Sequence, residues 1–208
     1  MCIPDVESRD LSSTNCGGFF VQPKLNIMKK ITILLVLLLS SFPLLSQEFR
    51  KPSEGKVLVY ITRSASAGFA INFKFFDGEN YLGKFNGGKY LVYECDPGEH
   101  LFWAKSENFD FVEANLESGK VYILDAVGKM GGFKAAVQLK PLEKNDEKHL
   151  GKIIKVINKN KEVQLDAVGL DENDKAEIEE LIAKSKEKLE EKRSKKEIKQ
   201  ITADMNYM

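Results

Sequence analysis

Residues 70–95, AINFKFFDGENYLGKFNGGKYLVYEC, alternate short apolar runs with turn-forming residues. In the run 70–76, apolar side chains at every second position predict a strand with one buried face. Asp77-Gly78 between two such runs is a strong hairpin signal. Asn86-Gly87-Gly88 predicts a second tight hairpin, and Asp96-Pro97-Gly98 predicts a third turn.

The same pattern extends in both directions, over residues 56–142. Turn signals recur about every 8–12 residues with no helical pattern between them, which is typical of a sandwich or barrel. We therefore expect a mainly β fold, an antiparallel β-sandwich of about seven to eight strands. The candidate strands are 56–63, 70–76, 79–85, 89–95, 100–106, 109–116, 120–127 and 133–140.

Beyond Leu142 the spacing of apolar residues changes from two to three and four. The segment 145–160 therefore predicts an amphipathic helix, and Asn145 is a suitable N-cap. A short link follows, with a candidate strand at 162–165.

A second helix is predicted over about 175–199, because Asp174 and Glu177 resemble a capping box. Its apolar positions become sparse toward the end, so we expect its first turns to dock and its later turns to be solvated. The prediction for 143–208 is thus a C-terminal helical appendage that follows the sandwich.

Residues 28–46 have the features of a secretory signal peptide. Met28-Lys29-Lys30 supplies a basic start, and the 15 residues 31–45 form a mainly apolar run. This run is shorter than the roughly 20 residues that a membrane-spanning helix needs. We expect cleavage between Ser46 and Gln47, with an uncleaved membrane tether as the alternative.

The segment 1–27 precedes this signal and carries acidic residues, which an export signal normally lacks at its start. We interpret it as a leader that is not translated or is disordered, and 47–55 as a linker. Cys2 and Cys16 fall before the expected cleavage site, which leaves Cys95 alone. Since no cysteine follows the apolar run directly, the mature protein is not expected to be a lipoprotein.

Charge is balanced along the chain, with 31 basic and 31 acidic residues. Cleavage would remove four basic and three acidic residues, which leaves 27 and 28. A nearly neutral protein lacks the overall basic field that non-specific nucleic-acid binding needs, so we expect no nucleic-acid partner.

One segment resembles a phosphate-binding loop. Residues 83–90, GKFNGGKY, approach the pattern G-x-x-x-x-G-K-[ST], but Tyr90 stands where Ser or Thr would hold Mg²⁺. The pattern also needs a helix next, whereas 90–95 predict a strand. We therefore expect no nucleotide partner.

His100 and His149 are the two histidines, and neither has a Cys or His nearby at zinc-like spacing. Both are interpreted as structural imidazoles, and Cys95 as a buried apolar thiol. The predictions are no catalytic residue, no metal site and no cofactor, while the ligand-binding residues stay unknown.

For several aromatic and basic residues, both a binding role and a structural role are considered. Tyr81, Phe85 and Tyr90 flank a turn and could form an exposed patch, although packing across a hairpin is favoured. Trp103 lies in a run that is apolar on both faces, which indicates a central strand. Arg63 beside the small residues 64–68 could bind an anion, but a strand exit is the simpler interpretation.

The turn motifs of 56–140 together resemble the bacterial domain of unknown function 2846, and more broadly the PEGA-type repeats of bacterial surface proteins. The motifs are Arg63, Gly68, Asp77-Gly78, Leu82-Gly83, Gly88-Lys89-Tyr90, Pro97-Gly98-Glu99-His100 and Gly119-Lys120-Val121-Tyr122. The resemblance implies a small exported β-sandwich and offers no catalytic residues to transfer.

From these observations we expect an exported, non-enzymatic envelope protein, periplasmic or secreted, whose β-sandwich is an interaction module. Its partner would be an envelope protein or a cell-surface component, and the mature chain would have no stable transmembrane span. The alternative is a periplasmic carrier that binds a small apolar ligand in the β-domain. A hydrolase is a third hypothesis and rests only on the two histidines and scattered aspartates.

Overall fold

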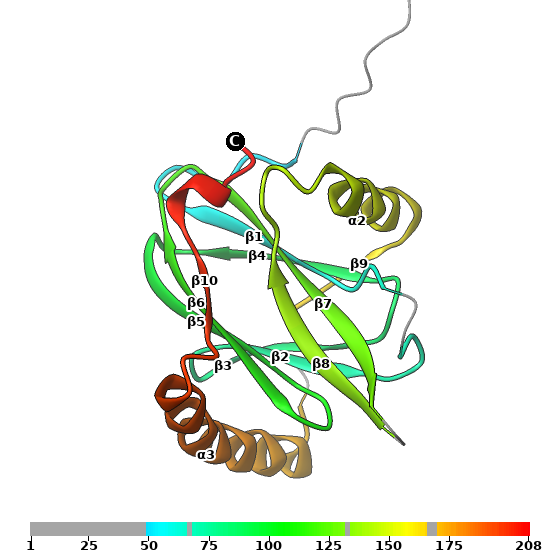
Figure 1. Ribbon diagram of the computed structural model, residues 1–208, viewed down its shortest axis with the longest axis vertical. Helices are drawn as coiled ribbons and strands as arrows, with labels where there is room; N and C mark the ends of the chain where they lie inside the picture. The colour runs from blue at the N-terminus through cyan, green and yellow to red at the C-terminus, as the bar shows by residue number, and fades with distance from the viewer. Residues whose placement is uncertain (1–48, 66–67, 132–133, 166–169) are drawn as a thin grey trace, which may run out of the picture. The chain divides into compact units, whose positions relative to one another are not determined.

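A computed structural model describes residues 49–65, 68–131, 134–165 and 170–208 (Figure 1). Within these residues the protein is mainly β, with ten strands in two five-stranded sheets and two α-helices. The prediction of a mainly β fold is confirmed. The predicted leader and signal peptide, 1–46, lie outside the described residues.

Each sheet has one continuous strand order. Sheet A runs β8 (Lys134–Pro141), β7 (Val121–Gly131), β1 (Val57–Thr62), β4 (Tyr90–Cys95) and β9 (Glu162–Val163). Sheet B runs β10 (Lys199–Ile201), β6 (Phe109–Leu116), β5 (Gly98–Lys105), β2 (Phe73–Asp77) and β3 (Asn80–Phe85). Trp103 lies on the middle strand of sheet B, as the apolar character of both its faces predicts.

The prediction that the sheets are antiparallel is only partly right, because both sheets are mixed. Strand β1 pairs in parallel with β7, β4 with β9, and β6 with β10. Strands β1 and β7 are separated by five other strands, so their pairing depends on how the whole chain folds back. Local alternation of apolar residues predicts which face of a strand is buried. It does not predict whether the neighbouring strand is parallel or antiparallel.

A single hydrophobic cluster draws buried side chains from both sheets, which gives a sandwich-like packing. In sheet A the inward side chains include Val59 and Leu124, and in sheet B they include Phe75 and Phe85. The rings of Phe75 and Phe85 stack with their centroids 4.4 Å apart. Burial of such side chains stabilises a fold by about 1.5–3 kcal/mol each.

Strand β2 departs from simple alternation. Its register shifts between Phe75 and Phe76, so both of these consecutive rings are buried. Phe75 belongs to the cluster between the sheets, whereas Phe76 stacks on Trp103 at 3.8 Å in a separate cluster. Ile71, which the alternation places on the buried face, is 40% exposed because the strand begins only at Phe73.

The three predicted turns have two different roles. Asp77-Gly78 begins the hairpin between β2 and β3, where Asp77 pairs with Asn80. Asn86-Gly87-Gly88 instead carries the chain from β3 in sheet B to β4 in sheet A, so the predicted tight hairpin is wrong. Asp96-Pro97-Gly98 likewise leads from sheet A back to sheet B, into β5. Turn residues specify a change of direction, but not whether the flanking strands pair.

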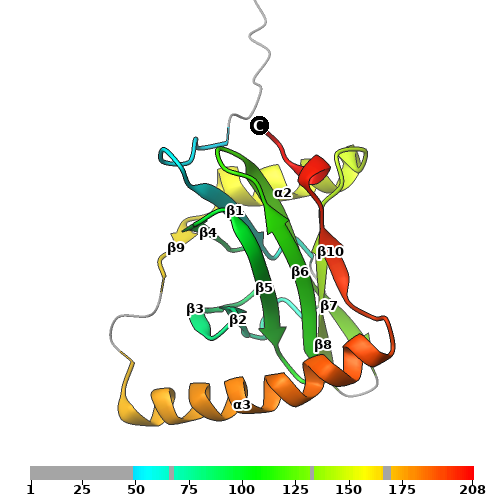
Figure 2. The same ribbon diagram turned by 90° about the vertical axis from the view of Figure 1, so that its left-hand side faces the viewer.

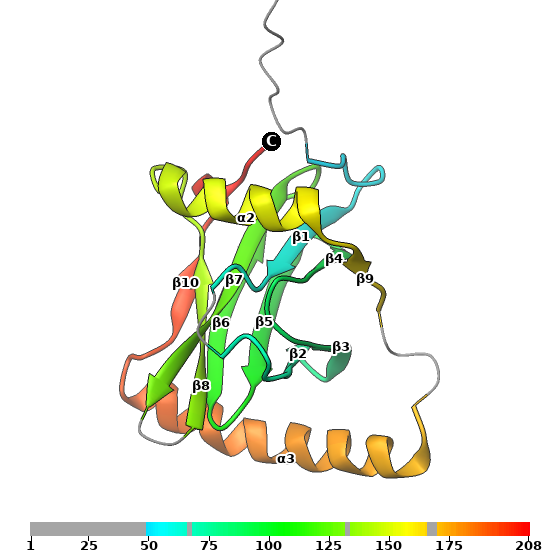
Figure 3. The same ribbon diagram turned by 90° about the vertical axis from the view of Figure 1, so that its right-hand side faces the viewer.

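The two helices cover the outer faces of the two sheets (Figures 2 and 3). Helix α2 (Glu147–Lys159) packs Leu150, Ile153 and Ile157 against sheet A. Helix α3 (Glu172–Ser194) packs against sheet B, and it remains docked as far as Leu189. Beyond Leu189 no residue of the helix is buried, in agreement with the prediction that its later turns are solvated.

The helix caps differ slightly from those predicted. Asp146, rather than Asn145, caps α2, since its side chain accepts a hydrogen bond from the backbone N–H of His149. Asp171 caps α3 and accepts from the N–H of Asp174 at 2.8 Å. In both helices the capping residue is an aspartate, and its negative charge also interacts favourably with the positive N-terminal end of the helix dipole.

Residues 143–208 contain the two predicted helices and also two strands. Strand β9 lies within the candidate strand at 162–165, whereas β10 was not predicted. The second helix ends at Ser194, and Lys196 adopts a positive φ of 56° that turns the chain into β10. A short 3₁₀-helix, η1 (Ala203–Met205), follows. The last residues then reach sheet A, where the N–H of Tyr207 donates to the carbonyl of Val121 at 2.8 Å.

Two side chains at the start of β6 close one side of the sandwich. Asn108 Oδ1 accepts from the N–H of Val137 in β8 at 2.7 Å, and its Nδ2 donates to the Val137 carbonyl at 3.0 Å. Asp110 Oδ2 accepts from the N–H of Leu139 at 2.7 Å. These side chains thus satisfy backbone groups at the edge of β8 that would otherwise lack a partner strand.

The first described residues, 49–55 of the predicted linker, lie against sheet A. Phe49 packs edge-on against Tyr60 and Tyr207, with centroids 5.1 and 5.9 Å apart. It thereby joins the same hydrophobic cluster as α2. No helix in the described ranges is both long and apolar enough to cross a membrane.

Candidate functional site

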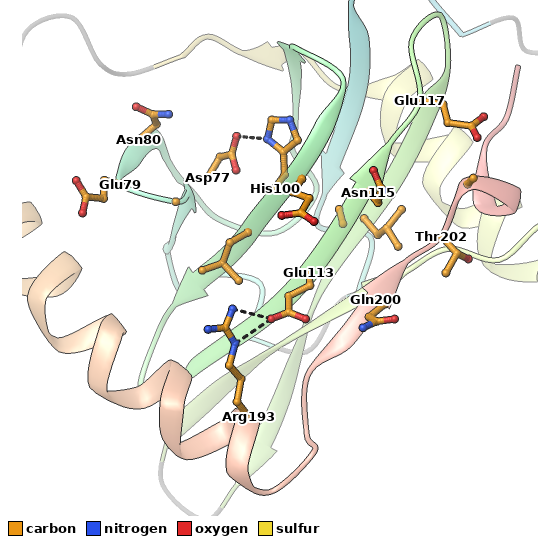
Figure 4. Close-up of a pocket in the computed structure, with 16 residues that line it drawn as sticks. Asp77, Glu79, Asn80, His100, Glu113, Asn115, Glu117, Arg193, Gln200 and Thr202 are labelled. Atoms are coloured by element: carbon orange, nitrogen blue, oxygen red, sulfur yellow. Dashed lines mark hydrogen bonds and ion pairs between the residues drawn. The ribbon is translucent and has the colours of Figure 1, made fainter.

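A groove of about 840 Å³ lies where the β2–β3 turn, β5, β6, the end of α3 and the C-terminal segment meet (Figure 4). Its walls are mainly polar. The charged side chains that line it are Asp77, Glu79, Glu99, His100, Glu113, Glu117 and Arg193. Five of these seven are acidic, so the groove carries a net negative charge even with His100 protonated.

Ion pairs neutralise only part of this charge. Arg193 on α3 donates two hydrogen bonds to Glu113 Oε1 on β6, at 3.0 and 2.8 Å. Glu79 pairs with Lys186 at 2.8 Å. Glu99 and Glu117 form no ion pair with any described residue, and both are exposed. The carboxylates of Glu99 and Glu117 are therefore available to bind a basic group of a partner.

His100 lies at one end of the groove, in a network with Asp77 and Tyr93. Its Nδ1 is 2.7 Å from Asp77 Oδ2, and its Nε2 is 2.8 Å from the backbone carbonyl of Asp96. Tyr93 also donates to Asp77 Oδ2, at 3.1 Å. Since both ring nitrogens of His100 face acceptors, both must carry hydrogen, and the imidazole is a cation.

The pKa of His100 agrees with this geometry. The hydrogen bond from the ring to Asp77 is the largest of the effects that raise the pKa of His100 to about 10, against the opposing effect of burial. Cys95 itself is buried in the cluster between the sheets, as predicted. The charged form of His100 is therefore a fixed part of the fold at neutral pH.

His149 forms the second histidine–aspartate pair. Its Nε2 lies 2.7 Å from Oδ2 of Asp125, a residue of β7 that is fully buried. Asp125 also accepts hydrogen bonds from Thr62 Oγ1 at 2.6 Å and from Ser64, through the backbone N–H at 2.9 Å and Oγ at 2.6 Å.

These donors set the charge of the pair. Burial alone would raise the pKa of Asp125, but hydrogen bonds from His149, Ser64 and Thr62 outweigh it, so the pKa lies below its usual range. The hydrogen bond to Asp125 in turn raises the pKa of His149. The pair is therefore an ion pair at neutral pH.

Ser64, His149 and Asp125 have the residue types of a hydrolytic triad but not its arrangement. In a triad the aspartate binds one ring nitrogen and the serine faces the other. Here Nε2 of His149 faces both Asp125 and Ser64, and the serine hydroxyl donates to the carboxylate. The histidine is thus not placed to remove a proton from Ser64, which leaves the hydrolase hypothesis without a relay at this position.

The other sequence candidates lie in three separate places. Tyr81 packs on Phe76, whereas Phe85 is buried between the sheets and Tyr90 lies beside Tyr60. They form no common aromatic patch. The residues after Lys89 form β4 rather than a helix, as the sequence predicts for the loop that resembles a phosphate site.

Arg63 serves the loop between β1 and β2. Its guanidinium is buried, lies 3.6 Å from the ring centroid of Phe73, and donates to the carbonyls of Gly68, Ile71 and Phe85. Burial lowers the pKa of Arg63 to about 10. Because its two terminal NH₂ groups bind backbone carbonyls, they are not directed at an anion, and the strand-exit interpretation fits better; its Nε is buried without a hydrogen-bond partner.

Sequence analysis missed the roles of Asp77 and Asp125, the buried carboxylates that bind the two histidines. Asp77 ends the apolar run FKFFD (73–77), and Asp125 interrupts the apolar run VYILDAV (121–127). A carboxylate inside a buried strand requires a charged or hydrogen-bonding partner. That requirement was a usable signal, although it could not identify His100 or His149 as the partners.

A second cavity, of about 640 Å³, lies beside α2 and includes His149, Asp146, Lys140 and Lys199 among its lining residues. Across the described residues, no group of three or more His, Cys, Asp or Glu side chains is arranged to hold a metal ion.

Comparison with known proteins identifies no relative. No family model matches the chain, and neither a curated protein nor a solved structure matches it. The resemblance to the domain of unknown function 2846 therefore stays a prediction, and the function must be argued from the structure itself.

Proposed function

We propose that this protein is exported and acts as a non-enzymatic interaction module of the cell envelope, with the acidic groove on sheet B as its binding surface. The observation that carries the proposal is the groove itself, because five structural elements contribute to it and exposed carboxylates line it. Export is supported by the signal-peptide features of 28–46.

The two histidine–aspartate pairs support a structural rather than a chemical role for the titratable groups. The acceptors and donors around Asp77 and Asp125 are already paired within the fold. Catalytic groups instead need a free acid, base or nucleophile that faces substrate. The partner that fits the groove is a protein or cell-surface component that presents basic groups to Glu99 and Glu117.

The alternative of an apolar-ligand carrier has less support. A carrier needs an apolar cavity of several hundred Å³. The described space between the sheets is occupied by side chains such as the stacked rings of Phe75 and Phe85, and the groove and the second cavity are both lined mainly by polar residues. Native mass spectrometry of the isolated protein tests this directly, since a co-purifying apolar ligand would favour the carrier.

Export is tested by cell fractionation followed by intact mass and N-terminal sequencing. The expected result is a chain that begins near Gln47 in the periplasmic or secreted fraction. A full-length cytoplasmic chain would contradict export.

The binding surface is tested by a photo-crosslinking residue at Asn115, which lines the groove. A matched control places the same residue at Ala183, which is exposed on α3 outside the groove. We expect one discrete crosslinked partner from Asn115 and none from Ala183. The double variant Glu99→Gln/Glu117→Gln should weaken that crosslink, whereas Glu179→Gln/Glu187→Gln on α3 should not. Equal crosslinking at both positions would argue against the groove.

A further inference from the structure

Helix α2 presents a row of lysines to solvent, on the side opposite the one that packs on sheet A. Lys148, Lys152, Lys155 and Lys159, called here the lysine face, recur at spacings of four, three and four. That spacing returns to the same side of a helix with 3.6 residues per turn. All four side chains are exposed, while Ile153 is fully buried beneath them.

The lysine face has no partner within the described part of the chain. None of its four ammonium groups forms an ion pair there, and the acidic residues Asp146 and Glu147 lie only at the first turn of the helix. The helix dipole favours a cation in the last turn, so it accounts for Lys159 alone.

Helix α3, the other helix of the described chain, differs from α2 in this respect, although isolated lysines elsewhere, such as Lys84 and Lys144, also form no ion pair. Every lysine and arginine of α3 forms an ion pair. The pairs are Lys175–Glu172, Lys184–Glu180, Lys186–Glu79, Lys188–Glu191, Lys192–Glu197 and Arg193–Glu113. The protein therefore neutralises the cations of one helix and leaves those of the other available.

We propose that the lysine face binds the anionic surface of a phospholipid membrane. The row extends for about 16 Å along the exposed side of one helix, so it can meet several negative charges of a flat array at once. Lysine is a compact point charge that suits such a surface, whereas planar bidentate recognition of single groups favours arginine. The inference shares export with the proposed function but does not depend on the groove.

Co-sedimentation of the isolated protein with lipid vesicles tests the proposal. The probes are vesicles of phosphatidylglycerol with phosphatidylethanolamine and neutral vesicles of phosphatidylcholine. We expect binding to the anionic vesicles only, and weakening as salt rises from low ionic strength to 0.5 M, since ions screen exposed charges. Failure to bind anionic vesicles at low salt would overturn the proposal.

Charge-matched variants assign the binding to α2. Lys152→Gln/Lys155→Gln should weaken the affinity about 25-fold, since each lysine near an anionic surface contributes about fivefold. Lys184→Gln/Lys188→Gln on α3 removes the same net charge and should change the affinity by less than about threefold. Lys152→Arg/Lys155→Arg should retain binding, which shows that the positions tolerate substitution. Equal losses for the α2 and α3 doubles would contradict a specific face.

A soluble polyanion distinguishes the partner class. If duplex nucleic acid or heparin binds the protein more tightly than the vesicles do and displaces it from them, the lysine face serves a polymer rather than a membrane. That outcome would overturn the membrane assignment without affecting the groove.

Discussion

The Nε2 atom of His149 in α2 lies 2.7 Å from the Oδ2 atom of Asp125 in β7, and this contact joins the helix to the sheet that it covers. The aspartate is fully buried and accepts further hydrogen bonds from Thr62 and Ser64. A buried carboxylate with this many donors is well satisfied, so the contact adds specificity to the apolar packing of α2. Its energetic importance can be measured from either partner.

Asp125→Ala should destabilise the protein by about 3–5 kcal/mol, because it removes the closest acceptor of the His149 cation and leaves three further donors, Thr62 Oγ1 and the N–H and Oγ of Ser64, without theirs. His149→Ala should cost less, about 1.5–3 kcal/mol, since Asp125 keeps its hydrogen bonds from Thr62 and Ser64. Urea denaturation followed by circular dichroism gives both free energies of unfolding. Asn158→Ala, on the exposed side of α2, is the control and should change stability by less than about 0.5 kcal/mol. A larger loss for His149→Ala than for Asp125→Ala would contradict this assignment.

Stability should fall as the pH rises through the alkaline range. The hydrogen bond to Asp77 is the main effect that raises the pKa of His100 to about 10, above the value of about 6.5 in the unfolded chain. A raised pKa of a basic group means that the folded state binds the proton more tightly. The resulting stabilisation is complete below about pH 6.5 and is lost as the pH approaches 10.

Comparison of the wild type with His100→Asn isolates this contribution. The free energy of unfolding, measured at intervals from pH 6 to pH 10, should decline more steeply in the wild type. Groups common to both proteins, including His149, cancel in the difference. Parallel curves would show that His100 is not held as a cation.

Asn108→Ala should destabilise the sandwich by about 2–4 kcal/mol, because it removes the partners of both the N–H and the C=O of buried Val137. Asn108→Asp should have an intermediate effect, since its carboxylate can still accept from the N–H but cannot donate. Hydrogen exchange at β8 should increase in both variants. Asn115→Ala, at an exposed site on β6, is the matched control. Unchanged exchange in β8 would show that the side chain does not protect this edge.

Arg63→Ala should release the loop between β1 and β2, because the carbonyls of Gly68, Ile71 and Phe85 would lose their donor. We expect a loss of about 3 kcal/mol or more in stability, and faster proteolysis of the loop. Arg63→Lys should recover only part of this loss, since an ammonium group lacks the planar fork that reaches several carbonyls. Full recovery by lysine would indicate that charge alone matters at this position.

Gly87→Ala should disturb the same loop from the opposite side. A Cβ atom at Gly87 would lie 2.5 Å from Cδ2 and 2.9 Å from Cα of Phe69, so the loop backbone must move. Gly55→Ala is the control for space, because a Cβ there meets nothing within 4 Å, although its φ of 77° adds strain. Thermal unfolding should show a larger loss for Gly87→Ala, and additional limited proteolysis should map to 64–72. Equal or smaller losses at Gly87 would contradict the close contact.

The sequence alone determined the elements whose signals are local. Alternating apolar residues identified most of β1 to β8, and three- to four-residue spacing identified α2 and α3. The burial of Cys95 and the central position of Trp103 also followed from their immediate neighbours. These properties depend on residues within a few positions of one another, so the local sequence is enough to predict them.

Only the tertiary structure decided how those elements combine. The sheet to which β3, β4 and β10 each belong, and the parallel pairing of β1 with β7, depend on packing between segments far apart in the chain. The same holds for His100 with Asp77 and His149 with Asp125, which are 23 and 24 residues apart. A buried carboxylate requires some partner, but which side chain supplies it depends on the route of the whole backbone through space.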